Sequence, residues 1–439
     1  MKLFSRAMLA GVMLAASTMV AAAADKTEIS LSRFFGACDA DYGTVTDVSK
    51  ANGECGIITA LINKFNADSK TTVVKPEIVE WPGYDQLTAR IKSGEPPVIS
   101  VMHASVISDY SSRGLLEPLD DGFKKVGIDP ASFTDSGRNA VTKDGKIYAL
   151  PFDTHSWLWH INMNLFKKAG LVDADGKPVL PKSPDELLAQ AKQFKEKTGK
   201  PYFVMFTVKE TAAFTRDMDT LLDQQDSNWM ADPTKVDLSG PEAKNALTLL
   251  KTLYDNGDIT KDQDYAAGNA GFIKGDGGVM VNGTWVIDSL DQESKKPDGA
   301  LANGYEVRPF PQLYKNPKLW ADSHSWVILK QDLTDAQRAS AYEFLKFLYD
   351  NNFQWARTGH LSVSKAVVDS AEFKALPHRA DIASVATNGT PLPSAVKRQF
   401  GIQDIEGEEV ANGMMGAKTV DQALADAQSR INELLANAK

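Results

Sequence analysis

Cysteine and positive charge are scarce in this chain of 439 residues. It has two cysteines, and its 48 Lys and Arg residues are outnumbered by 57 Asp and Glu residues, for a formal net charge of −9. Two thiols without Cys-x-x-Cys spacing do not favour a metal site or redox chemistry. An acidic protein repels nucleic acid and anionic membranes, so we expect neither as a partner.

The common signatures of catalysis and nucleotide binding are also missing. The sequence has no His-Glu-x-x-His motif, no Gly-x-Ser-x-Gly motif and no phosphate-binding loop of the Walker type. Residues 173–176 match part of a calcium-loop pattern, but the twelve-residue spacing that ends in Glu is absent. We therefore expect no catalytic residue, no metal and no cofactor.

Long apolar runs are absent beyond the first two dozen residues. Lys2 and Arg6 precede a short apolar run, residues 7–20, and small residues follow up to Ala24. This order is typical of a secretory signal peptide, and the run is too short to span a bilayer. We expect residues 1–24 to be cleaved and the protein to act in a bacterial periplasm. Because no cysteine adjoins the cleavage point, we expect no lipid anchor.

An oxidising compartment gives the two cysteines a structural role. Cys38 and Cys55 are separated by 16 residues that are rich in Asp, Gly, Thr and Asn. An even number of cysteines in an exported chain favours pairing, so we predict a disulfide between them. Closing a loop of about 15 residues is expected to stabilise the fold by roughly 3 kcal/mol.

Apolar spacing alternates between the periods of strands and helices along the chain. Strands are predicted at residues 28–35, 73–79, 97–102, 156–162, 201–208 and 279–282. Helices are predicted at residues 56–66, 85–93, 107–113, 183–197, 241–256, 334–351 and 419–437. This alternation is typical of α/β domains with parallel sheets. Because about 415 residues exceed the size of a single core, we expect two lobes with a cleft between them.

Several short phrases occur in a characteristic order and spacing. They are residues 84–87 (YDQL), 94–97 (GEPP), 114–119 (GLLEPL), 144–151 (DGKIYALP), 165–171 (LFKKAGL), 282–285 (NGTW), 359–361 (GHL) and 419–424 (TVDQAL). With this ordered set, the chain resembles the extracellular solute-binding proteins of carbohydrate ABC importers, the maltose-binding-protein-like family, over nearly its whole mature length. Val98 departs from the pattern, because the family usually has an acidic residue there.

The resemblance implies a two-lobed periplasmic-binding-protein fold of type II, in which each lobe is a mostly parallel sheet flanked by helices. Residues 25–153 with about 327–365 would form the N-terminal lobe. Residues from about 154 to 326 with 366–439 would form the C-terminal lobe. Such a protein captures a small carbohydrate by lobe closure, delivers it to the membrane permease subunits of the importer, and is expected to be a monomer.

A sugar-binding site needs flat aromatic surfaces and planar polar side chains. Trp285 matches the family's stacking tryptophan, and Glu210 falls at a family contact position. Asp153, at a predicted crossing between the lobes, would accept hydrogen bonds from two hydroxyls. The other candidates lie at predicted strand or loop ends that face the same region: Arg33, Phe35, His103, His155, His324, Arg357 and His360. Structural roles remain alternatives, such as a hinge ion pair for Asp153 and core packing for Trp285.

Two other functions stay open. An exported carbohydrate hydrolase would use Asp153 and Glu210 as a pair of carboxylates across the cleft. A binding protein could instead take a non-sugar solute such as a polyamine or phosphoester, and Arg33 and Arg357 keep an anionic sugar open. The favoured ligand is a small sugar or oligosaccharide, with an α-glucoside as one candidate.

Overall fold

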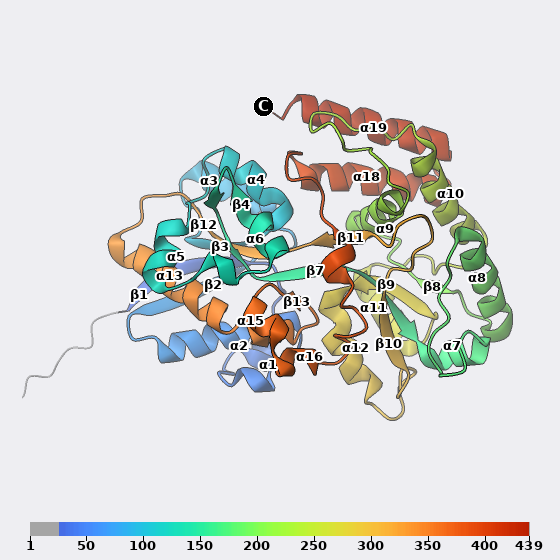
Figure 1. Ribbon diagram of the computed structural model, residues 1–439, viewed down its shortest axis with the longest axis horizontal. Coiled ribbons are helices and arrows are strands. Elements are labelled where there is room, and N and C mark those ends of the chain that lie inside the picture. Colours follow the sequence, from blue (N-terminus) through green and yellow to red (C-terminus); the bar gives the residue numbers. More distant parts are fainter. Residues whose placement is uncertain (1–25, 439) are drawn as a thin grey trace, which may run out of the picture.

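The computed structural model describes residues 26–438 of the chain, which fold into two α/β lobes side by side (Figure 1). The predicted signal peptide, residues 1–24, lies outside the described residues. Within residues 26–438, no helix has both the length and the apolar character that a membrane span requires.

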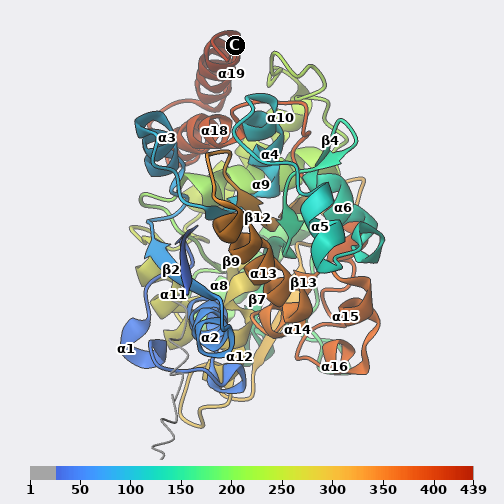
Figure 2. The same ribbon diagram turned by 90° about the vertical axis from the view of Figure 1, so that its left-hand side faces the viewer.

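The first lobe is built on a five-stranded sheet with the order β2-β1-β3-β12-β6. Its strands are β1 (Thr27–Arg33), β2 (Thr72–Ile78), β3 (Ile99–His103), β6 (Leu150–Pro151) and β12 (His324–Ile328). β1 pairs in parallel with β2 and β3, whereas β12 runs antiparallel to β3 and β6. The helices of this lobe include α2 (Gly53–Asp68), α3 (Tyr84–Ser93), α4 (Ala104–Ser112), α13 (Asp335–Asp350) and α14 (Asn352–Ala356). Figure 2 faces this lobe, with α13 and α2 in front.

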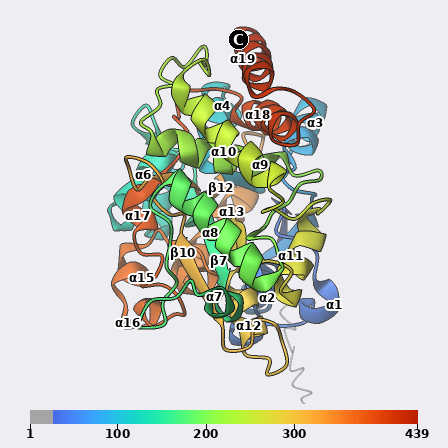
Figure 3. The same ribbon diagram turned by 90° about the vertical axis from the view of Figure 1, so that its right-hand side faces the viewer.

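The second lobe has a larger mixed sheet with the order β14-β11-β7-β9-β8, and β10 and β13 also pair with β7. Its strands are β7 (Asp153–Asn162), β8 (Phe203–Val204), β9 (Val279–Gly283), β10 (Tyr305–Pro309), β11 (Leu319–Asp322), β13 (Leu361–Ser362) and β14 (Gly389–Thr390). Its helices include α7 (Met163–Ala169), α8 (Pro184–Thr198), α9 (Thr211–Gln224), α10 (Pro241–Asp255), α11 (Tyr265–Lys274), α12 (Ile287–Ser294), α18 (Gln399–Met414) and α19 (Val420–Ala436). Figure 3 faces this lobe, with α8 and α10 in front.

Each lobe has its own hydrophobic core. Trp326 and Phe344 are fully buried in the first core, and Trp157 and Trp159 are fully buried in the second. The chain passes from the first core to the second after Phe152, returns before Trp326 and leaves again after Trp355. The two-lobed α/β fold expected from the sequence is confirmed, although antiparallel pairing makes both sheets mixed.

Local sequence signals explain where several elements begin and end. α8 starts after Ser183, whose side chain accepts a hydrogen bond from the Glu186 amide, and it ends at Gly199, which has a left-handed φ of 74°. β8 is shorter than the predicted strand 201–208, because the Thr207 amide donates instead to the Gln263 carbonyl of a neighbouring loop.

The predicted disulfide between Cys38 and Cys55 is present, with their Cα atoms 6.1 Å apart. It joins the loop that follows β1 to the first turn of α2. The bridge therefore fixes the loop that carries Phe35 and Gly36 next to the helix that carries Glu54, and these three residues line the same cavity.

Candidate ligand-binding site

A cavity of about 300 Å³ lies between the two lobes and is lined by residues from both. The first lobe contributes Phe34, Phe35, Gly36, Glu54, Trp81, His103 and His324. The second lobe contributes His155, Glu210, Ala212, Arg216, Tyr265 and Trp285. Six of these are sequence candidates: Phe35, His103, His155, Glu210, Trp285 and His324. Residues far apart in the sequence thus meet where the strands of both sheets end.

Direct contacts between residues of the two lobes hold the lobes together. The backbone amide of Gly53, at the start of α2, donates to Asp288 Oδ2 of α12 at 2.7 Å. Elsewhere the Phe400 ring of α18 lies 4.7 Å from the Tyr84 ring and 4.9 Å from the His103 ring, between centroids. The lobes are therefore closed over the cavity in this structure.

Trp285 presents an aromatic surface to the cavity directly after β9. Its indole Nε1 donates to the Tyr265 hydroxyl at 2.8 Å, which fixes the orientation of the ring. Burial raises the pKa of Tyr265, so this hydroxyl stays protonated and can also donate. Trp81 adds a second aromatic surface from the first lobe and is 40% exposed.

Arg216 projects from α9 into a cluster of tryptophan rings. Its guanidinium carbon lies 4.5 Å from the ring centroid of Trp320, 5.2 Å from those of Trp157 and Trp285, and 5.6 Å from that of Trp81. These are cation–π distances. Burial lowers its pKa to about 10, so the group remains charged at neutral pH. Within residues 26–438 it has no hydrogen bond or ion pair, although it lines the cavity.

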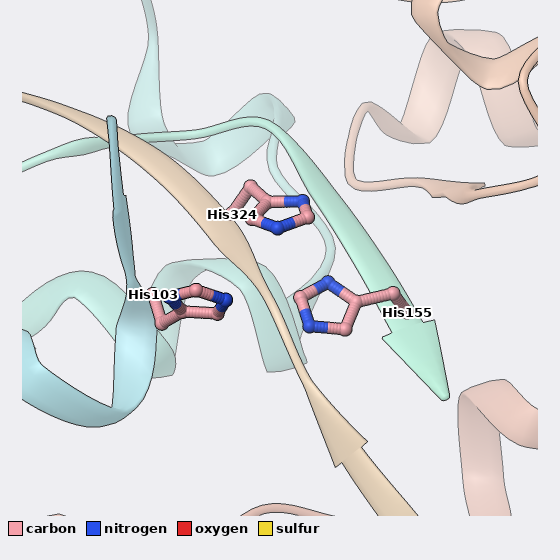
Figure 4. A group of neighbouring side chains, drawn as sticks. All are labelled: His103, His155 and His324. Atoms are coloured by element: carbon pink, nitrogen blue, oxygen red, sulfur yellow. The ribbon is translucent and has the colours of Figure 1, made fainter. Parts of the chain in front are cut away.

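Three histidines that line the cavity lie close together, as Figure 4 shows. His103 ends β3 and His324 begins β12, where the two residues pair across the strands, and His155 comes from β7. Burial lowers the pKa of His103 well below its ordinary value and that of His155 to about 3. Burial alone would also lower the pKa of His324, but its charge interaction and hydrogen bond with Asp153 raise it.

Asp153 lies beneath the histidines, fully buried, and does not line the cavity. Oδ1 accepts hydrogen bonds from His155 Nδ1 at 3.0 Å and from the His324 amide at 3.0 Å. Oδ2 accepts from His324 Nδ1 at 2.8 Å and from Trp355 Nε1 at 2.7 Å. Burial alone would raise the pKa of this carboxyl, but the neighbouring histidines hold it well below its ordinary range. The expected contact of Asp153 with two sugar hydroxyls is therefore corrected: its oxygens position imidazoles instead.

Three further candidates also lie outside the cavity lining. The Arg33 side chain donates to the Gly36 carbonyl at 2.7 Å and to Thr59 Oγ1 at 3.0 Å, so it braces the disulfide loop. Arg357 donates to the backbone carbonyls of residues 48, 49 and 51. These internal bonds occupy both guanidinium groups, which were expected to face the cleft.

His360 is also a supporting residue rather than a lining residue. Its Nδ1 lies 2.9 Å from Thr284 Oγ1 and its Nε2 lies 2.7 Å from Glu54 Oε1. It therefore links Thr284, the residue before Trp285 in the second lobe, to Glu54 in the first.

Seven lining residues were missed at the level of sequence: Phe34, Gly36, Glu54, Trp81, Ala212, Arg216 and Tyr265. Trp81 belongs to a Trp-Pro-Gly sequence, which predicts a turn but does not indicate a binding residue. Arg216 lies inside a helix beside Phe214 and Met218, where a single cation gives no indication that it faces a cavity. No spacing motif marks the three histidines either, although one ring nitrogen of each lies within 4.8 Å of the other two, a range in which one ion could be held.

The chain is similar in sequence to bacterial solute-binding proteins. The family model for bacterial extracellular solute-binding proteins matches residues 60–381. The sn-glycerol-3-phosphate-binding periplasmic protein UgpB of Escherichia coli (strain K12) is 24% identical over 406 residues, covering 87% of this chain and 90% of that protein. UgpB of Shigella flexneri matches with the same identity and coverage.

Solved structures share the fold over nearly the whole chain. The GacH receptor of Streptomyces glaucescens, determined unliganded and with acarbose, matches with a TM-score of 0.75 and 18% identity, covering 94% of this chain and 100% of that chain. Maltose-bound MalE3 of T. maritima matches with a TM-score of 0.76 and 18% identity, covering 93% of this chain and 99% of that chain. The common feature is the arrangement of two α/β lobes.

Proposed function

Because this chain belongs to the family of bacterial extracellular solute-binding proteins, we propose that it captures a small sugar in the cavity between its lobes. The family supplies ABC importers with solute, so the protein acts outside the cytoplasmic membrane, in partnership with a transporter. It is a binding protein and not an enzyme. We also propose that the signal peptide is cleaved and that the mature protein is a monomer in the periplasm without a lipid anchor.

The observation that carries this proposal is the pairing of aromatic surfaces with hydrogen-bonding groups around one cavity. Trp285 and Trp81 offer flat faces to the C–H surface of a sugar ring. Glu54, Glu210 and His155 offer polar atoms to hydroxyl groups from both lobes. A volume of about 300 Å³ is at the lower end for ligand sites, which favours one or two sugar rings, such as a small α-glucoside.

The contacts between the lobes suggest how binding is transmitted. A solute that bonds to groups of both lobes stabilises the closed form more than the open form, because its bonds to one lobe are lost when the lobes separate. The transporter can then distinguish loaded from empty protein by lobe closure.

The position of Asp153 argues against the alternative of a carbohydrate hydrolase. Such an enzyme needs two carboxyl groups that reach the scissile bond from either side. Glu210 lines the cavity, but Asp153 lies beneath the histidines with both oxygens bonded to protein groups. The proposed carboxylate pair therefore does not form.

Arg216 favours a second candidate, an anionic solute such as a phosphoester or an acidic sugar. A buried cation without a polar partner is costly, and an anion in the cavity would supply one. The UgpB relatives are named for binding sn-glycerol 3-phosphate, which is a phosphoester. Glu54 and Glu210 oppose this reading, because their charges repel an anion in the same cavity.

A thermal-shift screen of the purified mature protein tests the two candidates together. The solutes are neutral mono-, di- and trisaccharides, uronic acids and sn-glycerol 3-phosphate. We expect a neutral sugar to raise the melting temperature, because a solute that binds only the folded state stabilises it. A shift with glycerol 3-phosphate or uronic acids alone would replace the neutral sugar by the anionic candidate. No shift with any of them would overturn the proposal.

Calorimetric titration of a Trp285→Ala variant tests the site itself. Loss of ring stacking, worth about 0.5–1.5 kcal/mol, together with lost apolar contact should weaken sugar binding about tenfold or more. Tyr254→Ala serves as the control, since Tyr254 is a partly buried aromatic of the same lobe that does not line the cavity. Equal sugar affinities for wild type and Trp285→Ala would place the sugar elsewhere.

A further inference from the structure

We propose that His103, His155 and His324 bind a divalent transition-metal ion, with Zn²⁺ as the reference case, through their Nε2 atoms. The proposal does not depend on which solute the protein carries, because it concerns the ion alone. It also departs from the sequence, in which no metal was expected.

The first observation is that three histidine side chains lie close together. Three of the six histidines of the chain occupy one side of the cavity, and their rings face one another (Figure 4). The ring centroids are 4.2 Å apart for His155 and His324, 5.1 Å for His103 and His324, and 5.8 Å for His103 and His155. One ring nitrogen of each lies within 4.8 Å of the other two. Around a tetrahedral ion with bonds of about 2.0–2.1 Å these atoms would be about 3.3 Å apart, so the rings need only close in slightly.

The second observation is that the other nitrogen of every ring is already engaged. His155 Nδ1 and His324 Nδ1 bond to the two oxygens of Asp153, at 3.0 Å and 2.8 Å. His103 Nδ1 lies 2.7 Å from the Tyr84 hydroxyl, which also accepts a hydrogen bond from the His103 amide at 2.8 Å. Histidines that bind metals in proteins are commonly held in this way, by a carboxylate or another acceptor on the far nitrogen. The same bonds direct the Nε2 lone pairs away from Asp153 and Tyr84.

The third observation is that the three Nε2 atoms lack partners. No hydrogen bond to any of them exists within residues 26–438, and the three residues are only 1–4% exposed. These Nε2 atoms are not among the fully buried atoms without a partner, which shows that they face the cavity. Neighbouring nitrogen lone pairs that point at the same space repel one another, and a shared cation removes that repulsion.

The donor set selects the kind of ion. Imidazole nitrogens suit Zn²⁺, Cu²⁺, Ni²⁺ and Co²⁺, whereas Ca²⁺ and Mg²⁺ require oxygen ligands. Three protein ligands leave a fourth position, which here faces the cavity. Because His103 and His324 belong to the first lobe and His155 to the second, the ion would also join the lobes.

Metal titration of the mature protein, stripped with a chelator and free of sugar, tests this proposal. We expect one equivalent of Co²⁺ to bind and give the visible absorption of a four-coordinate ion, and one equivalent of Zn²⁺ to displace it. His103→Gln and His155→Gln should each weaken Zn²⁺ binding at least about 100-fold, since even the loss of a group that only orients a ligand costs about 10–100-fold. His378→Gln is the matched control, because His378 lies apart from the cavity beside Asp291 and Asp381.

The outcomes are decisive for the ion alone. If the wild-type protein binds neither ion stoichiometrically, or if both cavity variants bind Zn²⁺ as tightly as wild type, the proposal is overturned. Should His155→Gln fail to fold, His103→Gln decides, since the His103 side chain has Tyr84 as its only hydrogen-bond partner among the described residues. The sugar screen is run on both the metal-free and the metal-loaded protein and measures sugar binding alone. Failure of the sugar proposal would therefore not affect the result of the metal titration.

Discussion

At the scale of single residues, the site depends on side chains that a solute would never touch. Asp153 accepts four hydrogen bonds, and its negative charge is stabilised by His155 and His324. His360 fixes Glu54, which lines the cavity, and Trp355 is anchored to the same carboxylate as the histidines. The polar groups that face the solute are therefore positioned by a buried network.

Asp153→Asn should destabilise the protein as well as the site. An amide keeps the shape of the side chain but removes the charge and one of the two acceptor oxygens. Removing one partner of a buried charged pair typically costs about 3–5 kcal/mol, so the midpoint of chemical denaturation should fall markedly. Asp68→Asn is the control, because it disrupts only an exposed pair with Lys64 and should cost less than about 1 kcal/mol. Equal midpoints for wild type and Asp153→Asn would show that the carboxylate has no supporting role.

The sequence located about half of the cavity lining, for reasons that differ between residues. Trp285 and Glu210 were found through neighbouring phrases of the family, and His103 and His155 through their places at strand ends. Arg33 lies at the end of β1, near the cavity as predicted, but its side chain does not face the cavity. It donates to the Gly36 carbonyl instead, and residue spacing does not reveal such a contact. Arg216 and Trp81 were missed, since only the meeting of two lobes makes them neighbours.

At the scale of elements, long helices and strands with a clear apolar period were predicted, whereas α9, α11 and α18 and the short strands were missed. α8, α13 and α19 follow N-cap side chains that accept a hydrogen bond, and α10 begins at Pro241. Each has one apolar face, and their observed bounds differ from the expected ones by at most one residue at either end. Short strands such as β6, β13 and β14 have two residues each, too few to give a periodic signal. Their positions depend on pairing with strands distant in the sequence.

α9 and the neighbouring helix α18 carry a group of acids removed from solvent. Burial raises the pKa of Asp217 to about 7 and that of Asp223 to about 6. Burial together with neighbouring carboxyl groups raises the pKa values of Asp219 and Glu406 well above the ordinary range. The Asp219 carboxyl oxygens have no hydrogen-bond partner among residues 26–438. The folded state thus keeps protons that the unfolded state, with ordinary pKa values near 4, releases.

This difference makes a pH-dependent prediction for Asp219→Asn. A raised pKa in the folded state stabilises the fold below the ordinary pKa, and that stabilisation is lost as the pH rises through the folded-state pKa. At a pH below about 4 the carboxyl is protonated in the unfolded as well as in the folded protein, so an amide should leave the melting temperature nearly unchanged. At pH 8 the wild type loses stability because its buried carboxyl must either stay protonated or carry a charge without a partner. The amide has no such cost and should raise the melting temperature by a few degrees. Comparing variant with wild type at each pH cancels the contribution of the buried histidines, and a variant that is less stable than wild type at pH 8 would contradict the prediction.

At the scale of the whole molecule, we propose that the two lobes close around a solute. The chain crosses between the cores three times, so three segments of the chain join the lobes. Gly53 with Asp288, and Phe400 with Tyr84, are contacts that opening would break. The boundaries of the lobes near residues 153, 326 and 365 remain a prediction that hinge variants can test.

The central claim is that a solute held by both lobes stabilises the closed form. Small-angle X-ray scattering of the mature protein, without solute and saturated with a sugar identified by the screen, tests it most directly. We predict that the radius of gyration decreases on saturation in wild type, and that Trp285→Ala at the same sugar concentration retains the larger radius. An unchanged radius in wild-type protein with the sugar fully bound would contradict the account.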